Sequence, residues 1–362
     1  MTGPLIPHRK TDHIKICSTK IVESARSTGF EDIHLIHRSV PEIDMTEVDT
    51  SSTFFGHRLS LPLLIEAITG GTHPARQINQ RLAEVAQSLQ VAMGVGSQRI
   101  ALENSAFEAG FRIAREAAPD AFLIANIGAP QLAMGYGPEE ARKAVEMISA
   151  NALAIHVNAV QESVQPEGEP LAKGVVGKIT EIVREVDVPV IVKETGAGIS
   201  GEDAARLEAA GVSAVDVAGV GGTDWARVES YREGLAKKPS RSRIFYGWGI
   251  PTAASLVEVT QSTKLMAIAS GGIRDGLQVA KAIALGAAAA GLARPLLKPV
   301  MRSSQEVENR IGIIHRELRT AMFLTGSKTV GDLQKVPAVV VGNTHHWLTQ
   351  RGFDTTRYAR RN

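Results

Sequence analysis

Four polar side chains follow an apolar stretch in the middle of the chain. They are His156, Asn158, Gln161 and Glu162, and they come after the small apolar residues 152–155. Side chains two apart in a strand share one face, so His156 and Asn158 should point the same way, with the other two just beyond the strand end. An imidazole, two amides and a carboxylate can bind phosphate, orient a substrate, move a proton or hold a metal. A histidine at such a place is also often a packed rim residue, and this segment alone leaves both interpretations open.

A lysine ends the run with the strongest β-strand pattern, VPVIVKET from Val188. Alternation places Lys193 on the side of the strand opposite Val192. An ammonium that faces a protein interior is costly to desolvate unless an electron-rich partner meets it, which favours a cofactor or a Schiff base at Lys193. The alternative is an ion pair with Glu194 or another acid at the rim.

The elements that must position these residues recur along the whole chain. Short apolar runs, rich in β-branched or small residues, alternate with amphipathic helical patterns. The eight runs begin at Leu61, Val91, Ala121, Ala152, Val188, Ala214, Lys264 and Ala287. Eight buried strands alternating with helices in a chain of 362 residues predict an α/β fold, a (β/α)8 TIM barrel. Chemistry in this fold lies at the carboxyl ends of the strands, which is where the polar residues follow the runs.

Two loops near the end of the predicted barrel indicate a phosphate site. Gly271 and Gly272 precede a predicted helix start at Asp275, and the pair Ala293-Arg294 follows the eighth run. Barrels commonly hold a phosphate on the backbone N–H groups of the loops after strands seven and eight. Glycines can also serve only to turn tight loops, but both loops in this order favour a phosphorylated ligand.

The barrel prediction leaves three further segments. Residues 1–60 form an N-terminal extension, residues 61–362 hold the barrel, and an insertion after the sixth run spans residues 220–261. The C-terminal tail beyond Pro299 is predicted to be helical to about Thr325. We expect Trp225 and Trp248 to pack the insertion.

Composition argues against several classes of partner. The 40 basic and 38 acidic residues are dispersed and give a formal net charge of +2, so nucleic acid is not an expected partner. The single cysteine, Cys17, excludes an internal disulfide, and no early apolar stretch is long enough for a signal peptide or a membrane span. We therefore expect a cytoplasmic protein that does not bind membranes.

Taken in order, the motifs of the chain resemble those of the type 2 isopentenyl-diphosphate delta-isomerases, an FMN-dependent family. The matching segments are RKTDHI, ITGGT, VGSQR, NIGA, HVNAVQE, QPEGE, VKETGAGIS, GGTDW, FYGWGIP and SGGIRDG. HVNAVQE followed by QPEGE and GGTDW is the most specific part of a resemblance that runs from Arg9 to about Pro299. Two positions depart from the family pattern, because Glu66 stands where a small uncharged residue is expected and Ile68 where a methionine is more usual.

The resemblance implies an isomerase of isoprenoid biosynthesis that interconverts isopentenyl and dimethylallyl diphosphates. It implies reduced FMN, Mg²⁺ and NADPH as the reductant, in a homo-tetramer or homo-octamer. Flavin contacts are expected from Ala67, Ile68, Thr69, Ser97, Asn126, Lys193, Thr223, Gly271, Gly272, Ile273, Arg274, Ala293 and Arg294. Substrate contacts are expected from Arg9, Lys10, Ser97, Gln98, Arg99, His156, Asn158 and Gln161. Glu162 would hold the metal, Gln161 and Lys193 would be catalytic, and the N-terminal extension would contribute to the substrate site.

The implied chemistry suits these residue types. An unactivated alkene has no carbonyl to polarise, so its protonation develops carbocation character that an electron-rich reduced flavin can stabilise. Lys193 near the pyrimidine edge would favour the anionic reduced flavin. We expect the flavin to do most of the proton transfer, with Gln161 orienting the alkene and His156 occupied by phosphate.

Two other functions remain open from the sequence. An FMN-dependent 2-hydroxyacid oxidoreductase would share Lys193 and the glycine loops, but it gives no reason for QPEGE or for the Arg9-Lys10 pair. A non-catalytic phosphate-binding barrel would not need so many converging polar groups.

Overall fold

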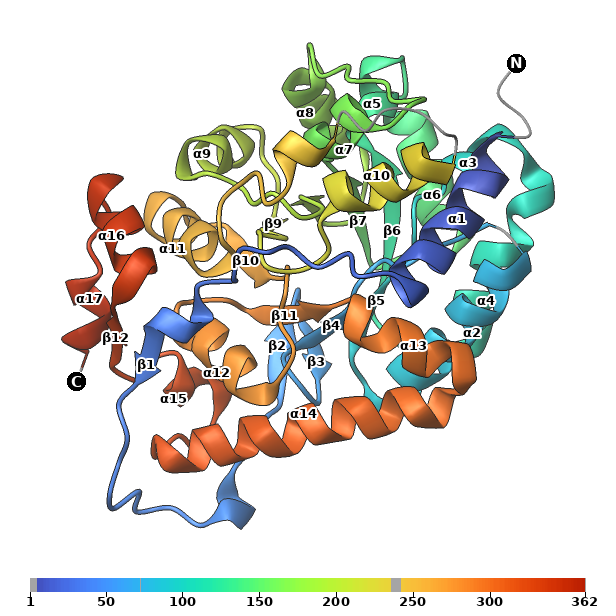
Figure 1. Ribbon diagram of the computed structural model, residues 1–362. Coiled ribbons are helices and arrows are strands. Elements are labelled where there is room, and N and C mark those ends of the chain that lie inside the picture. The colour runs from blue at the N-terminus through green and yellow to red at the C-terminus, as the bar shows by residue number, and fades with distance from the viewer. Residues whose placement is uncertain (1–4, 72, 236–241, 362) are drawn as a thin grey trace.

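Eight parallel strands close into a barrel in the computed structural model, which describes residues 5–71, 73–235 and 242–361 (Figure 1). Around the barrel the strands follow the order β10-β11-β4-β5-β6-β7-β8-β9, so each strand pairs with its neighbour in sequence. Their bounds are β4 Leu63–Ile65, β5 Ala92–Gly94, β6 Leu123–Gly128, β7 Ala152–His156, β8 Val190–Lys193, β9 Ala214–Asp216, β10 Met266–Ala269 and β11 Ala289–Leu292. Each lies within one of the eight predicted runs, which confirms the (β/α)8 barrel.

The register of the strands brings the polar strand ends together. Between β7 and β8, Ile155 lies opposite Val192 and His156 lies opposite Lys193. Lys193 in turn lies opposite Asp216 of β9. Parallel strands in this fold are buried on both faces, which accounts for their continuous apolar character up to the last residue.

Helices follow the strands and cover the barrel. They are α2 (His73–Leu89), α3 (Arg99–Glu103), α4 (Ala109–Ala117), α5 (Ala129–Ala133), α6 (Pro138–Met147), α7 (Ala159–Val164), α8 (Val175–Glu185), α9 (Gly201–Ala209), α11 (Thr252–Ser262), α12 (Gly276–Ala284) and α13 (Arg294–Arg302). The short α7 begins just after Asn158, so the residues of the HVNAVQE segment lie at the strand end and on the first turn of this helix.

The N-terminal extension contributes to both ends of the barrel. Helix α1 (Leu5–Thr19) contacts α10 (Trp225–Leu235) and α13 on the side of the strand carboxyl ends (Figure 1). The hairpin of β2 (Ser52–Phe54) and β3 (His57–Leu59) packs Phe54 against Phe122, with ring centroids 5.1 Å apart. Because Phe122 precedes β6, the hairpin closes the amino-terminal end of the bore.

The insertion after the sixth barrel strand is shorter than predicted. It holds α10 and η4 (Arg243–Phe245), and residues 236–241 within it lie outside the described part of the chain. Helix α11, which the prediction included, packs on α9 and β10 and so belongs to the barrel itself. Its residues Thr252 to Val259 are all buried, and a helix without a polar face gives no periodic signal to separate it from an irregular segment.

The tail confirms the helical prediction and adds a strand. Helix α14 (Ser304–Leu324) ends one residue before the predicted limit. Beyond it lie α15 (Val330–Leu333), β12 (Ala338–Val340), α16 (Gly342–Gln350) and α17 (Thr356–Ala359). Strand β12 pairs antiparallel with β1 (Ile33–Leu35) of the extension, which joins the two ends of the chain. Of the helices in the described residues, none has the length and apolar character needed to span a bilayer.

Candidate active site

Lys193 lies in a buried cluster of charges at the carboxyl end of the barrel. Its Nζ is 2.7 Å from Asp216 Oδ2 and 2.9 Å from Glu66 Oε2. Burial disfavours the ammonium, but the carboxylates of Asp216 and Glu66 outweigh that effect and raise the pKa of Lys193 above its usual value. Lys193 therefore stays charged. Glu194, the partner considered from the sequence, turns away and accepts from the backbone N–H groups of residues 195–197.

A cavity of about 680 Å³ opens above this cluster, between the ends of β8 to β11 and β4. We call it the glycine cavity. Its lining includes nine of the predicted flavin contacts, namely Ala67, Lys193, Thr223, Gly271, Gly272, Ile273, Arg274, Ala293 and Arg294. The other four, Ile68, Thr69, Ser97 and Asn126, line the neighbouring cavity.

The glycine cavity fits a phosphorylated planar group. Gly271 and Gly272 have φ values of +96° and +87°, a conformation that exposes successive backbone N–H groups and disfavours any side chain. An added Cβ at Gly222 would lie 2.6 Å from the backbone nitrogen of Gly272, so the loops can approach each other only as glycines.

The guanidinium groups of Arg274 and Arg294 form a possible anion-binding site beside these loops. Arg274 Nη2 and Arg294 Nη1 lie 3.1 and 2.6 Å from the same oxygen of Glu23, whose side chain is partly exposed. The two cations therefore already converge on one negatively charged oxygen. Arginine forks of this kind suit phosphate oxygens.

A second cavity, of about 990 Å³, adjoins the first. We call it the polar cavity. The two cavities share Ala67, Lys193, Thr195 and Trp225. Of the predicted substrate contacts, those that line the polar cavity are Arg9, Lys10, Ser97, Arg99, His156, Asn158 and Gln161. These contacts bring the basic side chains of Arg9, Lys10 and Arg99 together with polar side chains from strand ends and α7 around one space.

Helix α1 brings Lys10 to the wall of the polar cavity. Its ammonium donates to the carbonyls of Gly70 and Ser97, at 2.7 and 2.9 Å. Burial, with a contribution from the neighbouring Arg9, lowers the pKa of Lys10 to about 7. The lysine is therefore poised to take up a full charge when an anion binds.

His156 is held as a neutral imidazole. Its Nδ1 is 2.8 Å from Asn126 Oδ1, and the backbone of Asn126 is held in turn by Gln98. Burial and the charge of Lys193 lower the pKa of His156 to about 4. With Nδ1 engaged, Nε2 is left to face a ligand.

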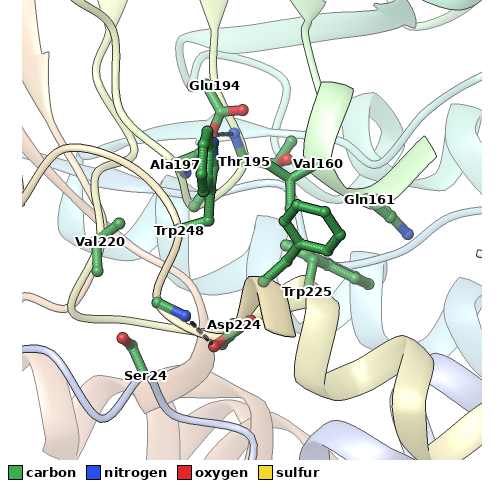
Figure 2. A pocket seen from close by; sticks show the side chains of 13 residues that line it. Ser24, Val160, Gln161, Glu194, Thr195, Ala197, Val220, Asp224, Trp225 and Trp248 are labelled. Atoms are coloured by element: carbon green, nitrogen blue, oxygen red, sulfur yellow. Dashed lines mark hydrogen bonds between the residues drawn. The ribbon is translucent and has the colours of Figure 1, made fainter. Parts of the chain in front are cut away.

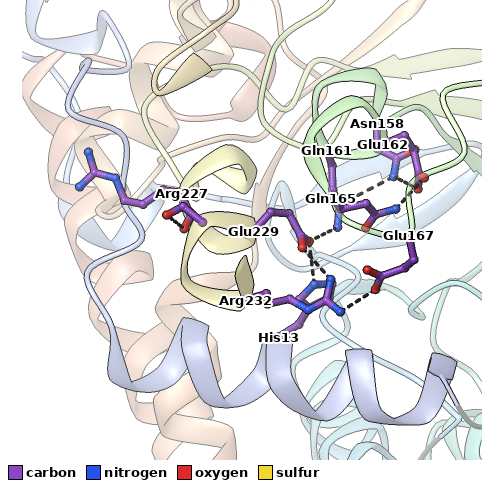
Figure 3. A network of polar contacts seen from close by, with 10 residues as sticks. His13, Asn158, Gln161, Glu162, Gln165, Glu167, Arg227, Glu229 and Arg232 are labelled. Atoms are coloured by element: carbon purple, nitrogen blue, oxygen red, sulfur yellow. Dashed lines mark hydrogen bonds and ion pairs between the residues drawn. The ribbon is translucent and has the colours of Figure 1, made fainter. Parts of the chain in front are cut away.

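Gln161 is fixed by a network that joins three helices (Figure 3). Its Nε2 donates to Glu229 Oε1 at 3.1 Å, and the same oxygen is 2.8 Å from His13 Nε2. Arg232 Nη1 donates to the other oxygen of Glu229 at 2.7 Å. Burial would raise the pKa of Glu229, but His13 and Arg232 outweigh it and hold the pKa below its usual range. An ionised, fully buried carboxylate therefore orients the amide of Gln161.

Comparisons with known proteins identify the family of the chain. Isopentenyl-diphosphate delta-isomerase of Methanothermobacter thermautotrophicus is 49% identical over 99% of this chain and 100% of its own length. The enzymes of the same name from Halobacterium salinarum and Pyrococcus abyssi are 48% and 46% identical, over 95% and 97% of this chain and 96% and 97% of their own. The chain belongs to the isopentenyl-diphosphate delta-isomerase family. The family model for FMN-dependent dehydrogenases also matches, over residues 108–339.

Solved structures agree on the fold. Mandelate oxidase with benzoyl-formic acid is similar with a TM-score of 0.62 and 18% identity, over 93% of this chain and 95% of that one. Another structure of mandelate oxidase has a TM-score of 0.63 at the same identity, over 92% of this chain and 95% of that one. At this identity the likeness concerns the barrel, and the relatives above favour the isomerase over the 2-hydroxyacid oxidoreductase alternative.

In this member of the isomerase family, Gln98 lies away from the polar cavity. Its side chain is fully buried, donates to Ala144 O at 2.8 Å and accepts from Asn126 N at 2.8 Å. Gln98 therefore holds the backbone of Asn126 in place from the side away from the cavity, and it does not line the polar cavity.

Glu162 lines the polar cavity, but its carboxylate is already engaged. Oε1 accepts from Asn158 Nδ2 at 2.9 Å, and Oε2 accepts from Gln165 Nε2 at 2.6 Å and from Glu169 N at 2.8 Å. Within the described residues, no three His, Cys, Asp or Glu side chains group closely enough to hold a metal by themselves. A cation here would need ligands from its substrate.

Two residues of this isomerase site were missed from the sequence. His13 stands in the RKTDHI motif, and Glu229 lies four residues after the Trp225 of GGTDW. The motifs pointed to both segments, but only the docking of α1 on α10 shows that the two side chains meet at Gln161.

The packing role expected for the two tryptophans is incomplete for both, because Trp248 packs edge-on against Phe245 of the insertion, with ring centroids 5.9 Å apart, but stays largely exposed. Both line a third hollow of about 330 Å³ beside Gln161, together with Val160 and Glu194 (Figure 2). Trp248 is 62% exposed, so it does not pack a core. Trp225 packs edge-on against His13, with ring centroids 5.1 Å apart, and so joins α1 to the cavities.

Proposed function

We propose that the chain interconverts isopentenyl and dimethylallyl diphosphates by flavin-assisted proton addition and elimination. The observation that carries this proposal is the pair of adjoining cavities that share Lys193. One has the glycine loops and arginines of a flavin phosphate site, and the other has basic donors together with an amide held in place by Glu229.

The residues of the glycine cavity would hold FMN. The backbone of Gly271 and Gly272, with Arg274 and Arg294, would take the phosphate, and Lys193 would lie at the isoalloxazine. When bound, reduced FMN supplies an electron-rich ring and a proton-exchanging edge. Lys193 keeps its positive charge in this buried position, so it favours an anionic neighbour.

The polar cavity would hold the substrate diphosphate. Arg9, Lys10 and Arg99 offer charge-assisted donors, and Asn158 adds a donor from the end of β7. His156 Nε2 lines the same cavity and would donate to phosphate once the charge of the bound diphosphate favours its protonation. Arg9 and Lys10 come from α1, so the N-terminal extension would contribute directly to the substrate site.

Gln161 would orient the alkene and can relay a proton. An amide is a weak acid and base, but Gln161 Nε2 already donates to Glu229. A proton arriving at the amide oxygen could therefore be balanced by transfer of an Nε2 proton to that carboxylate. Burial and the charge of Lys193 lower the pKa of His156, and Asn126 orients its ring, so His156 would bind phosphate and would not act as the base.

Glu162 would contribute to a Mg²⁺ ion shared with the diphosphate, since a hard cation binds few protein ligands when phosphate oxygens complete its shell. Glu162→Gln should then raise the Mg²⁺ concentration needed for half-maximal activity roughly tenfold and leave FMN affinity unchanged. An unchanged Mg²⁺ dependence would assign Glu162 to the support of Asn158 and Gln165 alone.

Further features of the proposal concern the cellular setting. NADPH would reduce the flavin, and the chain would assemble as a homo-tetramer or homo-octamer. A cytoplasmic location agrees with a chain whose single cysteine, Cys17, is a free thiol.

The decisive experiment is turnover by the purified protein. With FMN, Mg²⁺ and NADPH, the protein should convert isopentenyl diphosphate into dimethylallyl diphosphate, followed by product chromatography. Oxidation of a 2-hydroxy acid without any isomerisation would overturn the proposal in favour of the oxidoreductase.

A further inference from the structure

Glu66 places a carboxyl group in the lining of the glycine cavity. It follows β4 by one residue and Leu64 by two, so it faces the bore of the barrel. Only 3% of the residue is exposed. Its Oε2 lies 2.9 Å from Lys193 Nζ, but that ammonium is also 2.7 Å from Asp216.

Two carboxylates around one ammonium leave an uncompensated charge. If Glu66 and Asp216 were both ionised, the buried cluster would carry a net charge of −1. Burying an unpaired charge costs far more than burying a neutral acid, so such clusters retain a proton. The question is which of the two carboxyls holds it.

The hydrogen bonds assign the proton to Glu66. Asp216 accepts from Ser270 Oγ at 2.6 Å and from Ala218 N at 3.3 Å, in addition to Lys193. Three donors stabilise its ionised form. Glu66 has Lys193 as its charged partner and also contacts the carboxyl of Asp216, a contact between two acids that favours a proton on one of them. Its Oε1 is buried without a hydrogen-bond partner among the described residues. Burial, followed by the charge of Asp216, accordingly raises the pKa of Glu66 to about 8.

The surroundings of Glu66 are shaped to keep this carboxyl. A Cβ on Gly291 would collide with Glu66 Oε1, so the absence of a side chain at that position makes room for the group. The charged groups that face Glu66 are Lys193 and Asp216, and the other nearby polar side chains, Asn126 and Ser270, are neutral.

We propose that Glu66 is an uncharged carboxylic acid in the resting protein and acts as a positioning residue that keeps the cluster with Lys193 and Asp216 at zero net charge beside the cofactor. The proposal rests on the proposed function, because FMN is assigned to the glycine cavity there. With Glu66 neutral, an anionic reduced flavin meets a cluster that carries no net negative charge. Ionised Glu66 would add a negative charge beside the flavin and weaken the binding of reduced FMN more than that of oxidised FMN.

The first test uses the full-length protein without FMN. Infrared spectroscopy at pH 7 should show a carboxylic acid carbonyl band that is missing in Glu66→Gln and that disappears from the wild type above about pH 8. Asp216→Asn should also remove the band, because a single carboxylate beside Lys193 would ionise. Burial also raises the pKa of Glu194 to about 7, so all of these spectra are compared in the Glu194→Gln background, where the band of Glu66 should remain. Absence of the band from the wild type, or its persistence in Glu66→Gln or Asp216→Asn, would overturn the assignment.

The second test uses the FMN-loaded protein. The ratio of the Kd values for oxidised and reduced FMN should agree between wild type and Glu66→Gln at pH 6.5. At pH 9.5 the wild type should lose at least about tenfold in relative affinity for reduced FMN, while Glu66→Gln does not, apart from changes common to both. Equal ratios at both pH values would refute a role for Glu66 at the flavin. The infrared result needs neither FMN nor substrate, so its failure is distinct from a failure of the isomerase proposal.

Discussion

The side chains that fill the barrel bore form two sets, each with one residue from every strand. The second set, called the upper layer here, lies two residues further along each strand than the first, the lower layer. The lower layer is wholly apolar and consists of Leu64, Ala92, Ile124, Ala154, Ile191, Ala214, Ile268 and Ala289. The residues two positions further on are Glu66, Gly94, Asn126, His156, Lys193, Asp216, Ser270 and Gly291. Since side chains two apart share a face, both sets point into the bore. The upper layer contains every charge and no aliphatic side chain.

The lower layer stabilises the fold, and the upper layer, a short distance away, holds the groups that can do chemistry. Two residues of a strand rise about 6.6 Å. Below that step, each large apolar side chain contributes about 1.5–3 kcal/mol by its burial. Above it, Lys193 and Asp216 lose their contacts with water and are compensated by their ion pair with each other. Such a buried pair contributes little to stability and indicates a functional site.

The largest expected effect on stability comes from introducing a charged side chain into the lower layer. Ile191→Lys would place an ammonium two residues below Lys193, where the cluster offers no carboxylate. We expect a loss of more than about 4 kcal/mol in the free energy of unfolding, measured by urea denaturation. Ile191→Val, the matched control, should cost about 0.5–1.5 kcal/mol. A charged variant as stable as this control would show that the two layers do not differ as described.

Gln161 tests the chemistry above the upper layer. Gln161→Ala should lower kcat by about 10²-fold or more with little change in substrate affinity, since its contact would matter chiefly in the transition state. His156→Gln, within the upper layer, should instead chiefly raise KM. Steady-state kinetics with solvent-deuterium incorporation separates the two. The roles would be reversed if the Gln161 variant kept its kcat while the His156 variant bound substrate but incorporated no deuterium.

The upper layer also shows how much could be predicted from the sequence. The barrel and the polar strand ends were predictable because short continuous apolar runs and the residues that end them are local features. Lys193 was correctly expected to face the interior, but its ion pair was only the alternative interpretation, and the two acids come from β9 and from the end of β4, far away in sequence. Local patterns cannot specify which of several acids such a lysine meets.

Contacts made by the extension and the insertion were the least predictable. The bond between His13 and Glu229 depends on how α1 docks on α10, which neither segment encodes alone. The same holds for the pairing of β1 with β12 across about 300 residues, since three-residue strands carry almost no periodic signal. The exposed Trp248 shows the limit of compositional reasoning, because an aromatic side chain is not always a core residue.

The effect of Lys193 on FMN binding tests whether the charges of the upper layer serve the cofactor. Lys193→Ala should weaken FMN binding about tenfold or more, because the remaining carboxyls would face an electron-rich ring without a cation. Isothermal calorimetry measures this directly. Lys143→Ala, which removes an exposed lysine paired with Glu139 on α6, is the control and should leave FMN affinity unchanged. Equal affinities for all three proteins would remove Lys193 from the flavin site.

The smallest effect at neutral pH is expected at Lys10, and it contrasts two lysines of one site. Carboxylates keep Lys193 charged, whereas Lys10 contacts the carbonyls of Gly70 and Ser97 and the ring of Phe111, and burial lowers its pKa to about 7. A diphosphate binds the charged form better, so substrate capture should be complete below this pKa and decline as the pH rises through it. We expect kcat/KM to fall up to about tenfold per pH unit above pH 7 in the wild type and to stay flatter in Lys10→Arg, whose charge does not titrate. At pH 7 itself the titration should account for only about a twofold loss. Rate profiles from pH 6 to 9 provide the measurement, and parallel profiles for the two proteins would show that Lys10 remains charged throughout.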